Sequence, residues 1–357
     1  MRWPSLSRSP ADTGLTVLLA AFGAWLAWAL SAPVYMLLGP AVAVSLAGLA
    51  GMRTAIDARL RDGCFVILGV TVGAGFDADA LAAMVRWPLA FVLMGGVIVL
   101  ILVVSRMVLT RWFGFDARSA LLAAAPGHLS FVIAMASSIG SDVARISITQ
   151  SVRLLLLTLV VPFLAIAMGV DVSGNIAPLG AEMAPLRMVL LFAAAVLTGL
   201  AFKRFSVPAP LLLGAMVVSA LGHLTGVTAG VLPQWLVLPA YLVLGALIGT
   251  RFSGVTPALF FSGLAAGLTI TAIAVGLAGL GALPVAWGLE MPIAHVLVAF
   301  APGGLETMIA IGVVLNVVPG FVAACHIMRL VVLSIVLPWM LARLSRQAAQ
   351  PDGDRVI

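Results

Sequence analysis

The chain has 357 residues, of which 63% are hydrophobic and only 9% are charged, with a net charge of +6. A soluble globular protein has about 25% charged residues, and a disordered chain has few apolar ones, so both classes are excluded. In lipid, helices satisfy their own backbone hydrogen bonds. The composition therefore indicates an all-α polytopic membrane protein.

Apolar runs of about 17–25 residues predict transmembrane helices. The first half of the chain has such runs at about 15–31, 34–51, 63–76, 88–105, 119–139 and 146–168. The second half has them at about 187–202, 209–224, 233–250, 257–280, 291–315 and 319–342. The connections are too short for a soluble domain, so we predict two membrane units, residues 1–175 and 176–357.

The two halves share unusual residues at a constant spacing of 176. The run AAAPGHLS at 123–130 recurs as AFAPGGLE at 299–306, and Arg153 recurs as Arg329. Matches of Pro, Gly and Arg at one spacing are hard to obtain by chance, so they predict an internal duplication. A Gly-x3-Gly motif at 69–73 recurs at 245–249 and predicts close helix packing.

The basic residues indicate how the repeats are oriented. If all the segments cross, basic loops fall on both sides of the membrane. If the fifth segment of each repeat instead enters and returns, only Arg86 and Arg187 fall outside, apart from the embedded Arg153 and Arg329. Cytoplasmic loops collect Lys and Arg, so the second arrangement is favoured. It predicts inverted repeats in a bacterial inner membrane, with a cytoplasmic C-terminus.

Two motifs interrupt apolar segments near their middle, Ala125-Pro126-Gly127 and Ala301-Pro302-Gly303-Gly304. Proline removes a backbone donor and glycine accepts unusual backbone angles, so each motif should break its helix. The freed backbone groups must face protein or a water-filled cavity. Paired breaks in two repeats predict a transporter's binding site. The alternative is a tight turn between two short helices.

Arg153 and Arg329 each lie about ten residues into the last segment of their repeat, near the membrane midplane. A charge at that depth must face a cavity or a partner. Asp142 and Thr149 are predicted on the helical face of Arg153, with Gln150 beside it, while His326 precedes Arg329 at the position that matches Gln150. The arginines could contact an anion, act as a counter-ion, or clamp the free carbonyls of the breaks.

Glu306 follows the second break by one turn, and Ser130 takes the matching place after the first. A carboxylate at a helix N-terminus is favoured by the helix dipole. Glu306 could bind a coupling proton or cation, or it could only cap the helix or pair with Arg329. His128 replaces a glycine of the second motif and could titrate.

Enzymatic chemistry finds no support in the sequence. The two cysteines, Cys64 and Cys325, are far apart, and the four histidines form no pair at helical spacing. No metal site, cofactor or nucleophile with a base is therefore predicted, and no catalytic residue.

The APG-x-L breaks, the Ser141–Arg145 segment and the Gln150–Arg153 helix together resemble the AbrB family of duplicated bacterial membrane proteins. The LLGP at 37–40 and the LLG at 212–214 fit the same pattern. The resemblance covers residues 15 to 342, with His128 as the main departure. Such proteins are labelled transcriptional regulators or ammonia monooxygenases, and they are also similar to transporters with crossed broken helices.

The residues favour a secondary transporter of an unknown small solute, with an anion as one option and a proton or sodium ion as a coupling ion. The competing hypothesis is a membrane sensor or regulator that acts indirectly on gene expression. Direct nucleic-acid binding needs a basic module that reaches the grooves, and no segment is large enough. A homodimer is left open.

Overall fold

The computed structural model describes residues 10–76, 87–127, 129–169, 180–315 and 317–349. Within these ranges the chain is helical and has no β-strand, only an isolated bridge between Glu182 and Val231. Seven of the described helices are long and apolar enough to cross a membrane. The prediction of an all-α polytopic membrane protein is confirmed.

Helices of the first half begin and end close to the predicted segments. They are α1 (Pro10–Ala29), α2 (Tyr35–Leu49), α3 (Ala58–Gly73), α5 (Pro88–Phe113), α6 (Ala117–Ala124), α7 (Leu129–Ser138) and α8 (Val143–Ala167). The fifth predicted segment is thus not one helix but two short ones, α6 and α7.

The second half repeats this order. Its helices are α9 (Pro185–Arg204), α10 (Pro210–Leu224), α11 (Gln234–Gly249) with the short 3-10 helix η2 (Thr250–Phe252), α12 (Pro257–Leu289), α13 (Ile293–Phe300), α14 (Leu305–Val314) and α15 (Pro319–Ala349). Adding 176 to the bounds of α3, α6 and α7 gives the bounds of α11, α13 and α14 at both ends.

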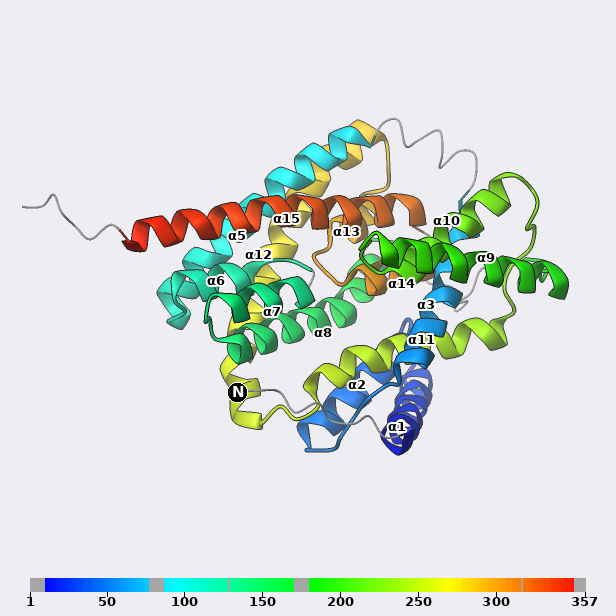
Figure 1. The fold of residues 1–357 in the computed structure, drawn as a ribbon, viewed down its shortest axis with the longest axis horizontal. Coiled ribbons are helices and arrows are strands. Elements are labelled where there is room, and N and C mark those ends of the chain that lie inside the picture. Colours follow the sequence, from blue (N-terminus) through cyan, green and yellow to red (C-terminus); the bar gives the residue numbers. More distant parts are fainter. Residues whose placement is uncertain (1–9, 77–86, 128, 170–179, 316, 350–357) are drawn as a thin grey trace, which may run out of the picture.

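The helices form two groups, each of which contains helices from both halves (Figure 1). The glycine group consists of α1, α2, α3, α9, α10 and α11, and the arginine group of α5 to α8 and α12 to α15. Helices α3 and α14 are among the few that touch across the boundary. The two halves of the sequence therefore interlock, and the boundary between the groups is not the boundary between the repeats.

Small residues allow the helices of the glycine group to pack closely. A Cβ atom added at Gly69 of α3 would lie 2.3 Å from the carbonyl oxygen of Leu212 in α10. In the other half, a Cβ at Gly245 of α11 would lie 2.4 Å from the carbonyl oxygen of Leu37 in α2. Both distances are too short for any side chain, so the packing role of the two Gly-x3-Gly motifs is confirmed.

Candidate functional site

The helix before each Pro-Gly motif ends in a similar way. The C-cap residue of α6 is Ala125, with φ −61° and ψ 117°, and that of α13 is Ala301, with φ −54° and ψ 127°. Both angles are extended, so the chain leaves the helix axis before Pro126 and Pro302, which are buried. Gly127 then turns the first interruption with a φ of +86°, which a side chain would disfavour.

Arg329 of α15 ties the second interruption together. Its Nη1 donates to the carbonyl oxygen of Ala301 at 2.9 Å, and its Nη2 donates to that of Gly303 at 2.7 Å. The same guanidinium group lies against the first interruption, because a Cβ added at Gly127 would be 3.2 Å from Nη2. Arg329 therefore brings the interruptions of the two repeats into contact with one side chain.

Arg153 of α8 forms fewer hydrogen bonds with its guanidinium group than Arg329 does. Its Nη1 donates to the carbonyl oxygen of Ala125 at 3.0 Å, but its Nε and Nη2 have no hydrogen-bond partner among the described residues. The side chain is only 1% exposed. Both guanidinium groups thus bind carbonyl groups of the interruptions, which is one of the roles that the sequence left open, but Arg153 keeps two buried donors without partners among the described residues.

Gln150 and His326 occupy matching places but make different contacts. The Nε2 of Gln150 donates to the carbonyl oxygen of Leu122 at 2.8 Å, and its Oε1 has no partner in the described part of the chain. The Nδ1 of His326 lies 2.9 Å from the carbonyl oxygen of Val322, one turn earlier in its own helix. His326 is buried and does not line the cavity described next.

A cavity of about 210 Å³, the deep cavity, lies between the two interruptions and the glycine group. It brings together six of the residues that the sequence singles out: Gly127, Gln150, Arg153, Gly304, Glu306 and Arg329. The glycine group contributes Pro208, Ala209 and Arg251. The cavity therefore lies at the boundary between the two helix groups.

A larger hollow of about 680 Å³, the vestibule, adjoins the deep cavity and shares Ala209, Arg251 and Glu306 with it. Its other polar side chains are Arg61, Asp62, Lys203, Thr250 and Thr307. Cations line both hollows, and Glu306 is the carboxylate at their junction.

Glu306 is half-buried in the first turn of α14, where the N-cap residue is Gly304 and no side chain caps the helix. Among the described residues it makes no hydrogen bond and no ion pair, although it attracts Arg251 electrostatically. It is therefore not the cap or direct partner of Arg329 that the sequence left open. Its carboxylate faces the cavity and the vestibule.

Other residues predicted for the site lie elsewhere or cannot be placed. Asp142 is exposed and caps α8, accepting a hydrogen bond from the backbone of Arg145 at 3.0 Å. The prediction that it extends the helical face of Arg153 is wrong, because Asp142 precedes the helix and its backbone is not helical. His128 and the side chain of Ser130 lie outside the described residues.

Residues 36–345 match the family model described as "Transition state regulatory protein AbrB". The chain belongs to the AbrB family. It is also similar to the "Uncharacterized protein YhjN" of Bacillus subtilis (strain 168), with 29% identity over 300 residues that cover 76% of this chain and 75% of that protein.

Sequence reasoning assigned no binding role to the cations that this AbrB-family chain contributes from the glycine group. Arg251, Lys203 and Arg61 belong to the basic loops that indicated the orientation of the repeats. Their counterparts in the other repeat are Gly75, Ala27 and Val237, so comparison of the repeats gives no hint of them. One sequence feature could have pointed to Arg251: it lies two residues after Gly249, the last residue of the Gly-x3-Gly motif that recurs in both repeats.

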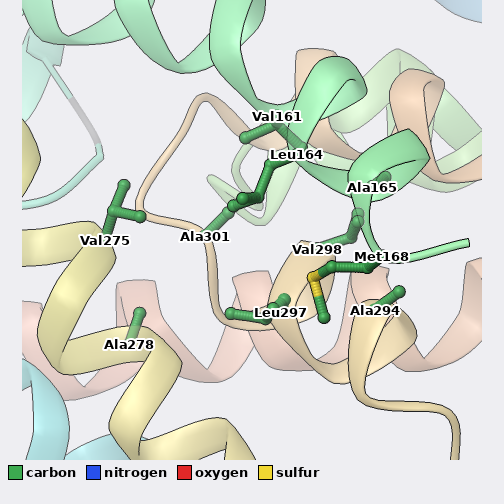
Figure 2. A pocket seen from close by; sticks show the side chains of 10 residues that line it. All are labelled: Val161, Leu164, Ala165, Met168, Val275, Ala278, Ala294, Leu297, Val298 and Ala301. Carbon is green, nitrogen blue, oxygen red and sulfur yellow. The ribbon is translucent and has the colours of Figure 1, made fainter.

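A separate pocket of the AbrB-family chain lies among α8, α12 and α13 (Figure 2). Side chains such as Val161, Met168, Val275 and Leu297 line it, and Ala301 reaches it from the second interruption. All its lining side chains are apolar, and its volume of about 20 Å³ is too small for an organic solute. The described residues also hold no group of three His, Cys, Asp or Glu side chains suited to a metal. The deep cavity is the better candidate site.

Proposed function

We propose that this protein is a secondary transporter of the bacterial inner membrane and that it binds a small anionic solute in the deep cavity. The observation that carries the proposal is Arg153, which is 1% exposed yet keeps Nε and Nη2 without a partner in the described ranges. Leaving charged donors unpaired inside a protein costs about 1–3 kcal/mol or more. An anion bound beside Arg153 would remove that cost.

The balance of charge around the cavity supports an anion over a cation. Arg153, Arg329 and Arg251 face it, and Glu306 is the one carboxylate among its described lining. Arg153 and Arg329 also repel each other. A volume of 210 Å³ lies below the about 300–1,000 Å³ of drug-sized pockets, which favours a small metabolite.

Two contacts favour inverted repeats with broken helices. The backbone N–H of Thr54 donates to the Oγ of Ser253 at 3.1 Å, and Arg61 and Lys203 line the same vestibule. If every predicted segment crossed, each of these pairs would be split between opposite sides of a layer about 30 Å thick. Both pairs share a side if α6–α7 and α13–α14 enter the membrane and return, as the basic residues also favour.

Transport would follow from movement of one helix group against the other. The glycine group supplies Arg251 to the deep cavity, and the arginine group supplies Arg153 and Arg329. Inverted repeats allow two arrangements of such groups that are related by a pseudo-two-fold axis in the membrane plane, each open to one side of the membrane. The interruptions would move with the solute, because they are tied to the arginines that bind it.

The test is binding followed by exchange. The purified protein is melted with phosphate, pyruvate, succinate or citrate, and any anion that raises the melting temperature is then used for counterflow in liposomes. We expect at least one such anion, and Arg153→Gln should abolish both effects while Arg204→Gln, on the exposed end of α9, leaves them intact. If no anion of the set shifts melting or exchanges, or if both variants behave alike, the proposal is wrong.

The inverted orientation has its own test. Phe205→Cys, beside Lys203 and 79% exposed at wild type, should escape an impermeant maleimide in intact cells and react after lysis. Val227→Cys, 66% exposed at wild type in the next connection, should react in intact cells. The reverse labelling pattern would restore the arrangement in which all segments cross.

A second candidate is a membrane sensor that acts indirectly on gene expression, as the family description names a regulatory protein. The contacts of Arg329 with both interruptions favour it, because a bound anion could be reported through them without being carried. Direct contact with DNA is not proposed, since the described connections between helices are short. A melting shift without counterflow would favour the sensor. Neither candidate involves catalysis or a cofactor.

A further inference from the structure

The vestibule carries charges that the duplication does not share. Lys203 and Arg251 line it, and the residues 176 positions earlier are Ala27 and Gly75. If the helix groups exchanged their arrangement, the matching opening on the other side would be lined by these uncharged residues. The two openings of the protein are therefore electrostatically different.

The two cations are also left without partners of their own. Asp62 in the vestibule forms an ion pair with Arg61, whose Nη2 lies 2.6 Å from the carboxylate oxygen Oδ1 of Asp62. In the described ranges neither Lys203 nor Arg251 forms an ion pair, and Arg251 is only attracted by Glu306 at the inner end. Lys203 and Arg251 are thus not neutralised by direct ion pairs, and the vestibule lining holds three cations against the two carboxylates of Asp62 and Glu306.

We infer that the vestibule is an anion-collecting entrance, in which Lys203 and Arg251 hold a small carboxylate or phosphate before it reaches Arg153. The sidedness rests on the proposed function and its topology, which place both residues on the cytoplasmic side. Charged hollows with low-dielectric walls raise the local concentration and association rate of counter-ions by about 10–10³-fold. The protein therefore captures its anion faster from the cytoplasm than from the outside.

Glu306 completes the path as the group that the anion must pass. It lines both the vestibule and the deep cavity, as Arg251 does. While no solute is present, the carboxylate of Glu306 attracts Arg251. An arriving anion takes the place of Glu306 as the partner of Arg251. It then reaches the deep cavity, where Nε and Nη2 of Arg153 have no partner among the described residues.

The test uses thiol reagents and does not depend on transport. Leu247, half-buried in the vestibule one turn before Arg251, is replaced as Leu247→Cys in a background in which Cys64 and Cys325 are alanine. Inside-out vesicles are treated with sulfonatoethyl or trimethylammonioethyl methanethiosulfonate, which forms a mixed disulfide and releases methanesulfinate. Each rate is divided by the rate of that reagent with free 2-mercaptoethanol.

We expect the anionic reagent to react about ten times faster than the cationic one after this normalisation. Lys203→Ala with Arg251→Ala should reduce the ratio to about one, and high salt should do the same. Arg204→Ala, which removes a neighbouring cation outside the vestibule, should leave the ratio unchanged. Right-side-out vesicles should react more slowly with the anionic reagent.

A ratio near one in the parent protein, or an equal loss in Arg204→Ala, would overturn the inference. Faster reaction from the outside would overturn its sidedness. The outcomes also separate it from the proposed function. A preserved ratio without counterflow leaves the entrance in place and refutes transport, whereas counterflow with a ratio of one refutes only the entrance.

Discussion

The helices before the two interruptions end with similar backbone angles at Ala125 and Ala301, but the arginines that bind these ends differ. Arg153 and Arg329 each follow their acceptor, Ala125 or Ala301, by 28 residues. Arg329 adds a second bond, to Gly303, while the corresponding Nη2 of Arg153 has no partner among the described residues. Within the described residues, the duplicated scaffold therefore holds one arginine that leaves only its Nε without a partner and one that leaves both Nε and Nη2 without partners.

The difference arises where the repeats meet. Arg329 lies against Gly127 of the first interruption, so one guanidinium group stabilises both repeats. Arg153 is thereby released from part of the structural role that its position would give it. Duplication thus provides the common frame, and divergence separates a stabilising arginine from one that is available to a ligand.

The largest expected effect compares Arg329→Ala with Arg153→Ala. A hydrogen bond from a charged donor contributes about 1.5–3 kcal/mol, so losing two of them in Arg329→Ala should cost about 3–6 kcal/mol. Arg153→Ala loses one such bond and also removes two unpartnered donors, so it should cost less than about 1.5 kcal/mol. Melting in detergent without any added anion measures both.

Lysine variants refine this comparison. Arg329→Lys should recover only part of the stability, because one ammonium group cannot reach both Ala301 and Gly303 as the planar fork does. Equal melting temperatures for Arg329→Ala and Arg153→Ala would show that the two arginines are equivalent and would remove the division of roles.

A smaller effect separates the glycines of the two interruptions. Gly127 has a φ of +86°, so Gly127→Ala should cost about 1–2 kcal/mol in backbone strain and also press on Arg329. Gly303 has no positive φ, and the three atoms nearest to an added Cβ all belong to the flexible side chain of Met308. Gly303→Ala should therefore be milder. A larger drop in melting temperature for Gly303→Ala would contradict this order.

Local sequence patterns were sufficient to predict several parts of the structure. Apolar run length marked the helices. Pro126 and Pro302 marked the interruptions because each is followed by glycine, whereas Pro162 and Pro338, without a glycine beside them, lie inside the continuous helices α8 and α15. The buried depth of Arg153 and Arg329 predicted that they turn to the interruptions, since lipid offers no partner for a guanidinium group. Each inference depends on a property of one segment.

The remaining parts depend on contacts between segments. The vestibule forms because α3, α9 and α11 meet, which places Arg61, Lys203 and Arg251 around one hollow. The sequence of any one of these helices does not indicate that the three helices pack around one hollow. The prediction for Asp142 failed for a related reason. Its spacing from Arg153 fits a residue inside the helix and also a residue that caps it, and only the position of the first hydrogen bond of α8 separates the two.

The smallest expected effect concerns the helix caps, where the repeats differ in charge. Asp116 caps α6 by accepting from the backbone N–H groups of Arg118 and Ser119, each at 3.0 Å, whereas Pro292 takes the matching place before α13 and cannot do so. Partial burial tends to raise the pKa of Asp116, but its hydrogen bonds with Ser119 and Arg118 outweigh this, so the pKa lies below its ordinary value.

A carboxyl group with a lowered pKa stabilises the folded protein above the unfolded value of about 3.9, and the gain is lost as the pH falls through the folded value. Asp116→Ala should therefore lower stability by about 0.5 kcal/mol at pH 7, the low end for a cap because Asp116 is exposed. The difference from wild type should shrink as the pH falls below the unfolded value of about 3.9 and be lost once the pH is below the folded value. Pro292→Ala removes no titrating group, so its effect on melting should be the same at pH 7 and at low pH. A pH-independent deficit in Asp116→Ala would show that the cap acts through its shape alone, and the repeats would then not differ in their response to acid.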